Sequence, residues 1–180
     1  MAGEEGALAE QAMKGDRDAF TGLVRMYERR VFALSCSLVG DYHTAQDAAQ
    51  ETFLRAFKGI QTLREPEKFG KWLVGIAYKV SRNFLRGEKK KTVAFPPGLP
   101  DSLAVLVKEG ADGDLKAKVI EVANGLPDES RALLALKYLE GFSYAEIGET
   151  MEIAPDLVKS RLFAARKQLR EKLGTYRTGE

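Results

Sequence analysis

The side chains in this sequence that could do chemistry are chiefly basic and aromatic, and two stretches concentrate them. Residues 61–91 carry nine basic and three acidic side chains, and residues 157–173 carry six basic and one acidic. The formal net charge of the whole chain is only +2, so acidic residues elsewhere conceal both stretches. Basic side chains neutralise phosphates and aromatic rings stack on bases, which makes both stretches candidates for nucleic-acid binding.

Side chains for covalent or metal catalysis are scarce. Cys36 is the only cysteine and His43 the only histidine. We interpret Cys36 as a packed residue at the end of an apolar helical stripe, and His43 as a loop residue ahead of a helix. Residues 87–92 read Gly-Glu-Lys-Lys-Lys-Thr but lack the upstream glycine of a phosphate-binding loop. We therefore expect neither an enzyme nor a bound metal or other cofactor.

The composition is that of a globular protein of one or two small domains, with 180 residues, 44% hydrophobic and 30% charged. The amino terminus, MAGEEGALAEQ, is acidic where a secretion signal would be basic. The longest apolar runs are about five residues, far below the roughly 20 that a membrane-spanning helix needs. A single cysteine excludes an intrachain disulfide. We expect a soluble cytoplasmic protein without membrane insertion.

Helical periodicity runs through almost the whole chain, and no segment alternates as a strand would. Apolar residues recur at three- and four-residue steps through residues 20–38, 45–57 and 69–84, and again from residue 114 onward. We predict an all-α protein in which helical domains at residues 10–86 and 114–173 are joined by a linker, residues 87–113. The linker contains Pro96, Pro97 and Pro100, which forbid a continuous helix. Its residues 102–108 are apolar enough for either a short helix or a docking segment.

The second domain is predicted to contain a helix-turn-helix. Ser143 and Glu146 form a capping box that opens a short helix, and a turn at Pro155 leads to a longer basic helix. That helix has one apolar face and one basic face, the latter comprising Lys159, Phe163, Arg166 and Arg170, flanked by Ser160 and Lys167. Such a helix can lie in the major groove with its first residues at base edges. The alternative is a solvated basic helix of an ordinary bundle.

The first domain offers two polar helical faces of different character. A helix is predicted from Thr44, as its capping residue, to Gly59. It presents acidic and amide groups around one aliphatic residue: Asp47, Gln50, Glu51, Leu54 and Lys58. That face is typical of docking on a partner protein, or it is an ordinary solvated face with a stray leucine. The next helix presents a face typical of single-strand binding: Lys71, Tyr78, Lys79, Arg82 and Arg86. Trp72 either packs in the core or stacks on a base.

Blocks of sequence in both domains resemble one known family. Asp47-Ala-Ala-Gln-Glu51-Thr-Phe53-Leu-Arg55-Ala-Phe57 and Phe69-Gly-Lys-Trp72-Leu73-Val-Gly-Ile76-Ala77 resemble the promoter-melting domain of bacterial sigma factors. Gly141-Phe-Ser143-Tyr-Ala-Glu146-Ile147-Gly and Val158-Lys159-Ser160-Arg161-Leu162-Phe163 resemble their carboxy-terminal domain. The resemblance is to the extracytoplasmic-function (ECF) class, the smallest members of the sigma-70 family, and it covers about residues 10–86 and 114–173.

The resemblance implies that residues 10–86 bind core RNA polymerase and recognise and melt the −10 promoter element, while residues 114–173 recognise the −35 element. It assigns polymerase contacts to Asp47, Gln50, Glu51, Leu54, Arg55 and Lys58, on a helix that resembles the segment gripping the β′ coiled coil, and it also implies contact with the β subunit. It assigns −10 DNA contacts to Lys71, Trp72, Tyr78, Lys79, Arg82, Asn83 and Arg86. It assigns −35 DNA contacts to Lys159, Ser160, Arg161, Phe163, Arg166 and Lys167. Further implied partners are promoter DNA, as duplex and as melted strand, and an anti-sigma factor.

The predicted function is therefore transcription initiation by an ECF-type sigma factor. The alternative is a stand-alone helix-turn-helix regulator of duplex DNA, which would need neither polar face of residues 10–86. Lys79, Asn83, Leu157 and Ala164 depart from residues common in the family. Because base preference depends on such side chains, the promoter sequence stays open.

Overall fold

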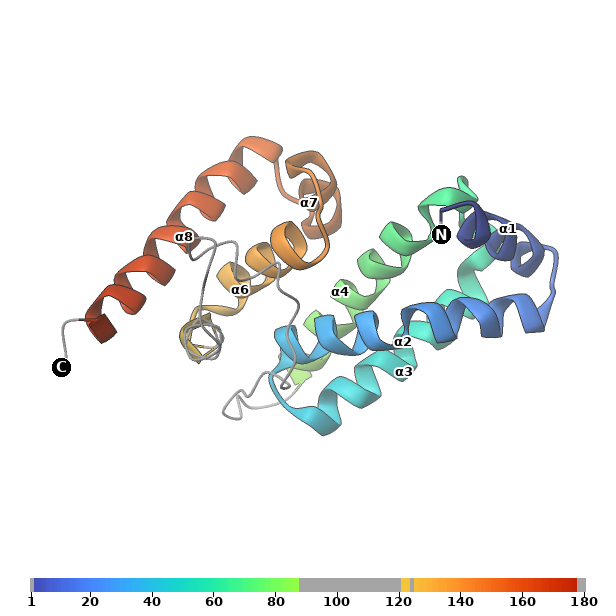
Figure 1. Ribbon diagram of the computed structural model, residues 1–180, viewed down its shortest axis with the longest axis horizontal. Helices are drawn as coiled ribbons and strands as arrows, with labels where there is room; N and C mark the ends of the chain where they lie inside the picture. The colour runs from blue at the N-terminus through green and yellow to red at the C-terminus, as the bar shows by residue number, and fades with distance from the viewer. Residues whose placement is uncertain (1, 88–120, 124, 178–180) are drawn as a thin grey trace.

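The computed structural model describes residues 2–87, 121–123 and 125–177, and these form helices with no strand among them (Figure 1). The first domain contains α1 (Ala2–Met13), α2 (Arg17–Val39), α3 (Tyr42–Gly59), the short 3-10 helices η1 (Ile60–Thr62) and η2 (Pro66–Lys68), and α4 (Phe69–Gly87). The second contains α6 (Asp128–Leu134), the π-helical turn η4 (Ala135–Leu139), α7 (Tyr144–Met151) and α8 (Pro155–Arg177). The all-α architecture predicted from the periodicity is confirmed. Most of the predicted linker, including residues 102–108, lies outside the described residues.

Three long helices, α2, α3 and α4, pack together to form the first domain, and α1 packs across α2. The core contains Leu23 and Val31 of α2 and Phe69 and Leu73 of α4, all at most 1% exposed. On α3 the inward residues are small, and Ala48 is fully buried, which lets the helix backbone approach its neighbours closely. The outer faces of α3 and α4 are thereby fixed on a rigid support.

The start of α3 differs from the prediction. Asp41, not Thr44, is the N-cap: its carboxylate accepts hydrogen bonds from the Thr44 backbone N–H at 2.8 Å and from the Thr44 hydroxyl at 2.7 Å. An aspartate is a strong N-cap because its charge also complements the helix dipole. The helix therefore begins three residues earlier than a cap at Thr44 would allow. His43 lies in its first turn, so the interpretation of His43 as a loop residue is wrong.

The helix-turn-helix of the second domain forms as predicted. The Ser143 side chain accepts from the Glu146 N–H, and the Glu146 carboxylate accepts from the Ser143 N–H, so both halves of the capping box are present. Glu152 ends α7 in the left-handed conformation, with φ 60°. The apolar face of α8 is buried to 1% exposure or less at Val158, Leu162, Ala165 and Leu169. This burial turns the basic face of α8 outward.

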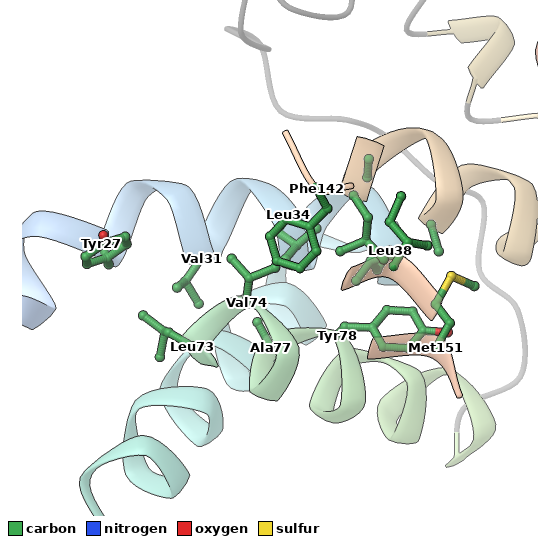
Figure 2. Packing of buried hydrophobic residues seen from close by; sticks show 14 of the residues in the cluster. Tyr27, Val31, Leu34, Leu38, Leu73, Val74, Ala77, Tyr78, Phe142 and Met151 are labelled. Atoms are coloured by element: carbon green, nitrogen blue, oxygen red, sulfur yellow. The ribbon is translucent and has the colours of Figure 1, made fainter. Parts of the chain in front are cut away.

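The two domains share an interface. Phe142 and Met151 of the second domain join Leu34, Leu38 and Tyr78 of the first in one buried cluster (Figure 2). Polar contacts flank this cluster. Arg30 lies 2.6 Å from the Glu140 carboxylate, and Arg131 Nη2 donates to the Leu38 carbonyl at 2.9 Å.

Candidate partner-binding and nucleic-acid-binding surfaces

The outer face of α3 carries the residues expected to bind a partner protein. Asp47, Gln50, Leu54, Arg55 and Lys58 are exposed, and Glu51 is half-buried. Arg55 Nε lies 2.6 Å from Glu51 Oε1, one helical turn away. An ion pair between adjacent turns fixes the direction of both side chains at little cost. The structure therefore displays all six predicted polymerase-binding residues on one helix.

Leu54 and Phe57 protrude from the carboxy-terminal half of α3. Leu54 is 54% exposed and Phe57 is 46% exposed. The sequence pattern placed Phe57 among the inward residues, but its side chain is buried only in part. The Phe57 ring packs edge-on against Phe20, with 5.1 Å between the ring centroids, and the remainder of the ring is exposed to solvent. Apolar groups surrounded by charged and amide side chains are the usual composition of a protein-binding patch.

The basic face of α4 borders a groove of about 650 Å³ between η1, η2, α4 and α7. Lys71 and Lys79 are exposed on its wall, and Asn83 is exposed further along α4. Trp72 is half-buried, packs against the core with its ring 5.8 Å from that of Phe69, and also lines the groove. The two interpretations of Trp72 are thus compatible, because one side of the ring contacts the core while the residue still borders the groove.

Tyr78 and Arg82 differ from the expectation of a freely exposed face. Tyr78 is only 6% exposed and lies at the junction between the domains (Figure 2). The Arg82 guanidinium lies 5.7 Å from the Tyr78 ring centroid and is half-buried. Placing Tyr78 on an exposed polar face is therefore wrong for this arrangement of the domains. The Arg86 side chain lies outside the described part of the chain.

The exposed face of α8 contains four of the six residues predicted to contact duplex DNA: Lys159, Ser160, Phe163 and Lys167. Phe163 is 59% exposed, although an aromatic ring of this size is usually buried. Ser160 donates its hydroxyl to the Leu157 carbonyl at 3.0 Å within the first turns of the helix. The arrangement fits a helix that enters the major groove by its amino-terminal half.

Two predicted DNA contacts on α8 serve the domain itself in this structure. Arg161 forms an ion pair with Glu129 of α6, which braces the two helices against each other. Arg166 is half-buried, and its Nη1 lies 3.4 Å from the Tyr138 hydroxyl. Arg166 therefore does not lie on the freely exposed face where the sequence pattern placed it, and the DNA contacts of Arg161 and Arg166 stay predictions.

Ion pairs between the domains were not foreseen from the sequence. Lys71 Nζ binds the Glu146 carboxylate, and Lys79 Nζ lies 3.3 Å from Glu152 Oε1. The hydrogen bond from Lys71, reinforced by the backbone N–H of Ser143, lowers the pKa of Glu146 to about 2. Partners separated by about 70 residues leave no periodic signal in a sequence, so only the capping role of Glu146 was visible.

The remaining candidates for chemistry have no site around them among the described residues. Cys36 is buried, and burial, together with the nearby Asp41 charge, raises its pKa to about 11. Within the described ranges no cluster of three histidine, cysteine or carboxylate side chains could hold a metal ion. No helix in those ranges is long and apolar enough to cross a membrane.

Comparison with known proteins supplies the class. Residues 23–91 match the family model of sigma-70 region 2, and residues 116–169 match that of sigma-70 region 4. The ECF RNA polymerase sigma factor SigW of Bacillus subtilis is 32% identical over 176 residues, which cover 91% of this chain and 94% of SigW. The ECF RNA polymerase sigma-E factor of Haemophilus influenzae is 29% identical over 93% of this chain and 94% of its own. The chain belongs to the sigma-70 family, and within that family to the ECF sigma factors.

Solved structures share the fold. CnrH, in complex with the cytosolic domain of CnrY, superposes with a TM-score of 0.69 at 23% identity, covering 96% of this chain and 98% of its own. The sigma factor RpoE from Bartonella quintana, in complex with the anti-sigma factor NepR, also has a TM-score of 0.69, at 22% identity and 86% coverage of this chain. At these identities the likeness concerns the fold alone.

Proposed function

We propose that this sigma factor binds core RNA polymerase through the outer face of α3, holds the melted −10 strand on α4, and reads the −35 duplex with α8. The observation that carries the proposal is the separation of three exposed faces of different chemistry. One is acidic and amide-rich around Leu54, one is basic beside Trp72, and one is basic around Phe163. A stand-alone duplex-binding regulator has no use for the first two.

Each face suits its proposed ligand. An apolar centre with a polar rim favours a protein surface such as the β′ coiled coil, with further contacts to β. The groove beside Trp72 has both a stacking surface and lysines for strand phosphates. The exposed start of α8 has lysine and serine side chains for phosphates and base edges, and an apolar ring for thymine methyl groups.

The proposal extends to the setting of the protein. We infer that it acts in the cytoplasm, where polymerase and promoter DNA are, and that its role is binding and strand separation rather than catalysis of a reaction. An anti-sigma factor is a further proposed partner, in line with the solved complex of the sigma factor RpoE with the anti-sigma factor NepR.

The test is binding to core RNA polymerase and promoter-dependent initiation on a library of upstream sequences. We expect a stable complex and a selected pair of promoter elements. Reversing the charge of the docking face with Asp47→Lys and Glu51→Lys should abolish polymerase binding, whereas Glu10→Lys on the exposed side of α1 should preserve it. Salt-sensitive duplex binding without any polymerase complex would instead establish a stand-alone regulator, and full binding by the double variant would place the docking face elsewhere.

A further inference from the structure

The helix that begins the helix-turn-helix, α7, lies against the basic wall of α4. Its carboxylates Glu146 and Glu149 line the same groove as Lys68 and Lys71, and Glu152 at its end pairs with Lys79. Acidic residues therefore recur at three-residue steps along α7 beside the lysines of the first domain. Carboxylates placed in this way occupy the positions that strand phosphates would need on α4.

Apolar and hydrogen-bonded contacts hold α7 in this position. Phe142, two residues before α7, is 1% exposed, and Met151 at the end of α7 is 6% exposed. Both enter the cluster that contains Leu38 and Tyr78 of the first domain, and Figure 2 shows Met151 beside the Tyr78 ring at this junction. Met151 and Tyr78 also line one cavity of about 340 Å³ between the domains. The contact is therefore a packed interface and not a pair of isolated ion pairs.

The side chains engaged by α7 are three of the seven assigned above to the −10 strand. Lys71 and Lys79 bind carboxylates of the second domain, and Tyr78 is buried at the junction. A strand on α4 would have to take both lysines from their carboxylate partners and would meet the negative charge of Glu149. DNA and α7 therefore cannot occupy this face together.

We propose that the free chain is closed, with α7 acting as an internal competitor of the melted promoter strand for Lys71, Lys79 and Tyr78 on α4. This inference rests on the proposed function of α4 and adds an autoinhibitory role for α7. Only the open fraction binds the strand, so the apparent affinity is the intrinsic affinity multiplied by that fraction. A partner that separates the two domains would raise the open fraction and so free α4 for the strand.

Zero-length carbodiimide crosslinking of the full chain tests whether the closed state exists. The reagent joins an amine to a carboxylate only where the two are in contact. We expect crosslinked peptides that contain Lys71 with Glu146 and Lys79 with Glu152, identified by mass spectrometry. Addition of a short single-stranded DNA of mixed sequence should remove both crosslinks at concentrations at which it binds. Absence of the crosslinks without DNA would overturn the closed state, and crosslinks that persist on the DNA-bound protein would overturn the competition.

A charge-removal variant tests the effect on affinity. Glu146→Gln with Glu152→Gln removes both partners of the lysines, and glutamine preserves the capping box at Ser143. The background carries Lys159→Ala and Lys167→Ala, so that α8 contributes little to DNA binding. We expect the variant to bind the fluorescein-labelled strand about threefold to tenfold more tightly than the background alone. The control, Glu10→Gln with Glu28→Gln, removes two exposed carboxylates of the first domain and should stay within about twofold.

The outcomes separate this inference from the proposed function. Equal affinity of the variant and its control would overturn the competition, even if the chain still binds polymerase and initiates at promoters. Failure of polymerase binding and initiation would overturn the proposed function, even if both crosslinks form. A strand that binds neither the variant nor the background would overturn the assignment of α4, and the competition with it.

Discussion

Arg30 of α2 and Glu140 at the end of η4 form an ion pair of 2.6 Å that joins the two domains. The partners differ in environment: the Glu140 side chain is 3% exposed and that of Arg30 is 42% exposed. Burial raises the pKa of Glu140, and the Arg30 charge opposes this effect. A buried carboxylate beside a half-exposed guanidinium adds little net stability. Removal of the guanidinium nevertheless destabilises the fold strongly, because the carboxylate is then buried without a counter-charge.

We therefore expect Arg30→Ala to lower the free energy of unfolding by about 3 kcal/mol at pH 7, because it leaves Glu140 buried without its counter-charge. A raised native-state pKa means that the contribution of Glu140 to stability is present at low pH and is lost as the pH rises through that pKa. The effect of Arg30→Ala should therefore be smaller at pH 4.5 than at pH 7. Urea unfolding at both pH values measures it, with Arg29→Ala on the same helix as control. Equal effects at both pH values would show that Glu140 is not the cause.

Local chemistry was predictable from the sequence wherever neighbouring residues determine it. The capping box of Ser143 and Glu146 and the buried face of α8 both follow from short-range spacing, and the structure contains both. The predicted start of α3 was wrong for a local reason as well, because Asp41 competes with Thr44 as the N-cap and is the stronger acceptor. Short-range rules therefore located the long helices α2, α3, α4 and α8, but they missed α1 and the true start of α3.

The burial and the ion-pair partners of side chains that meet distant parts of the chain could not be predicted from short-range spacing. Tyr78 has the spacing of an outward residue of α4, yet it is buried beside the second domain. Arg161 is a DNA contact by the family resemblance, yet in the structure it binds Glu129 of α6. In both cases a residue distant in the sequence decides the outcome, and one sequence contains no signal of that pairing. Burial at a tertiary contact overrides the pattern of the isolated helix.

The turn between α7 and α8 depends on the absence of a side chain at Gly148. A Cβ atom there would lie 2.7 Å from the Ile153 carbonyl oxygen, a backbone atom that also belongs to the tight turn. We expect Gly148→Ala to destabilise the second domain by about 1–3 kcal/mol, because the turn must shift to relieve the overlap. Gly75→Ala in α4 is the matched control: its Cβ meets nothing within 4 Å, and alanine favours the helix by roughly 0.5–1 kcal/mol. Thermal unfolding followed by circular dichroism measures both, and an unchanged midpoint for Gly148→Ala would refute the close approach.

The thiol of Cys36 should be almost inert in the folded chain. Burial is the main reason that its pKa rises to about 11, and the negative charge of Asp41 adds to this shift. At pH 8 only about 0.1% of the thiol would be ionised, and the thiolate is the reactive form. We expect an aromatic disulfide reagent to react at least about a hundredfold faster in guanidinium chloride than with the native chain, and the native rate to rise with pH up to about 11. Rapid stoichiometric reaction of the native chain would contradict the burial.

The exposed half of α8 supports a prediction that separates phosphate contacts from base contacts. Lys159→Ala should weaken binding to all duplexes by a similar factor and reduce the slope of log affinity against log salt by about one, since one phosphate contact is lost. Phe163→Ala removes a ring that is 59% exposed and should weaken binding mainly to the selected −35 sequence, by about 1–3 kcal/mol. Gln168→Ala, exposed later on the same helix, is the control, and polymerase binding should be unchanged in all three variants. Fluorescence anisotropy across a salt series gives both quantities. If Lys159→Ala and Phe163→Ala both bind DNA like the unaltered chain, the recognition helix is not α8. A helix that reads the duplex through these two side chains must lose affinity, salt dependence or sequence preference when they are removed.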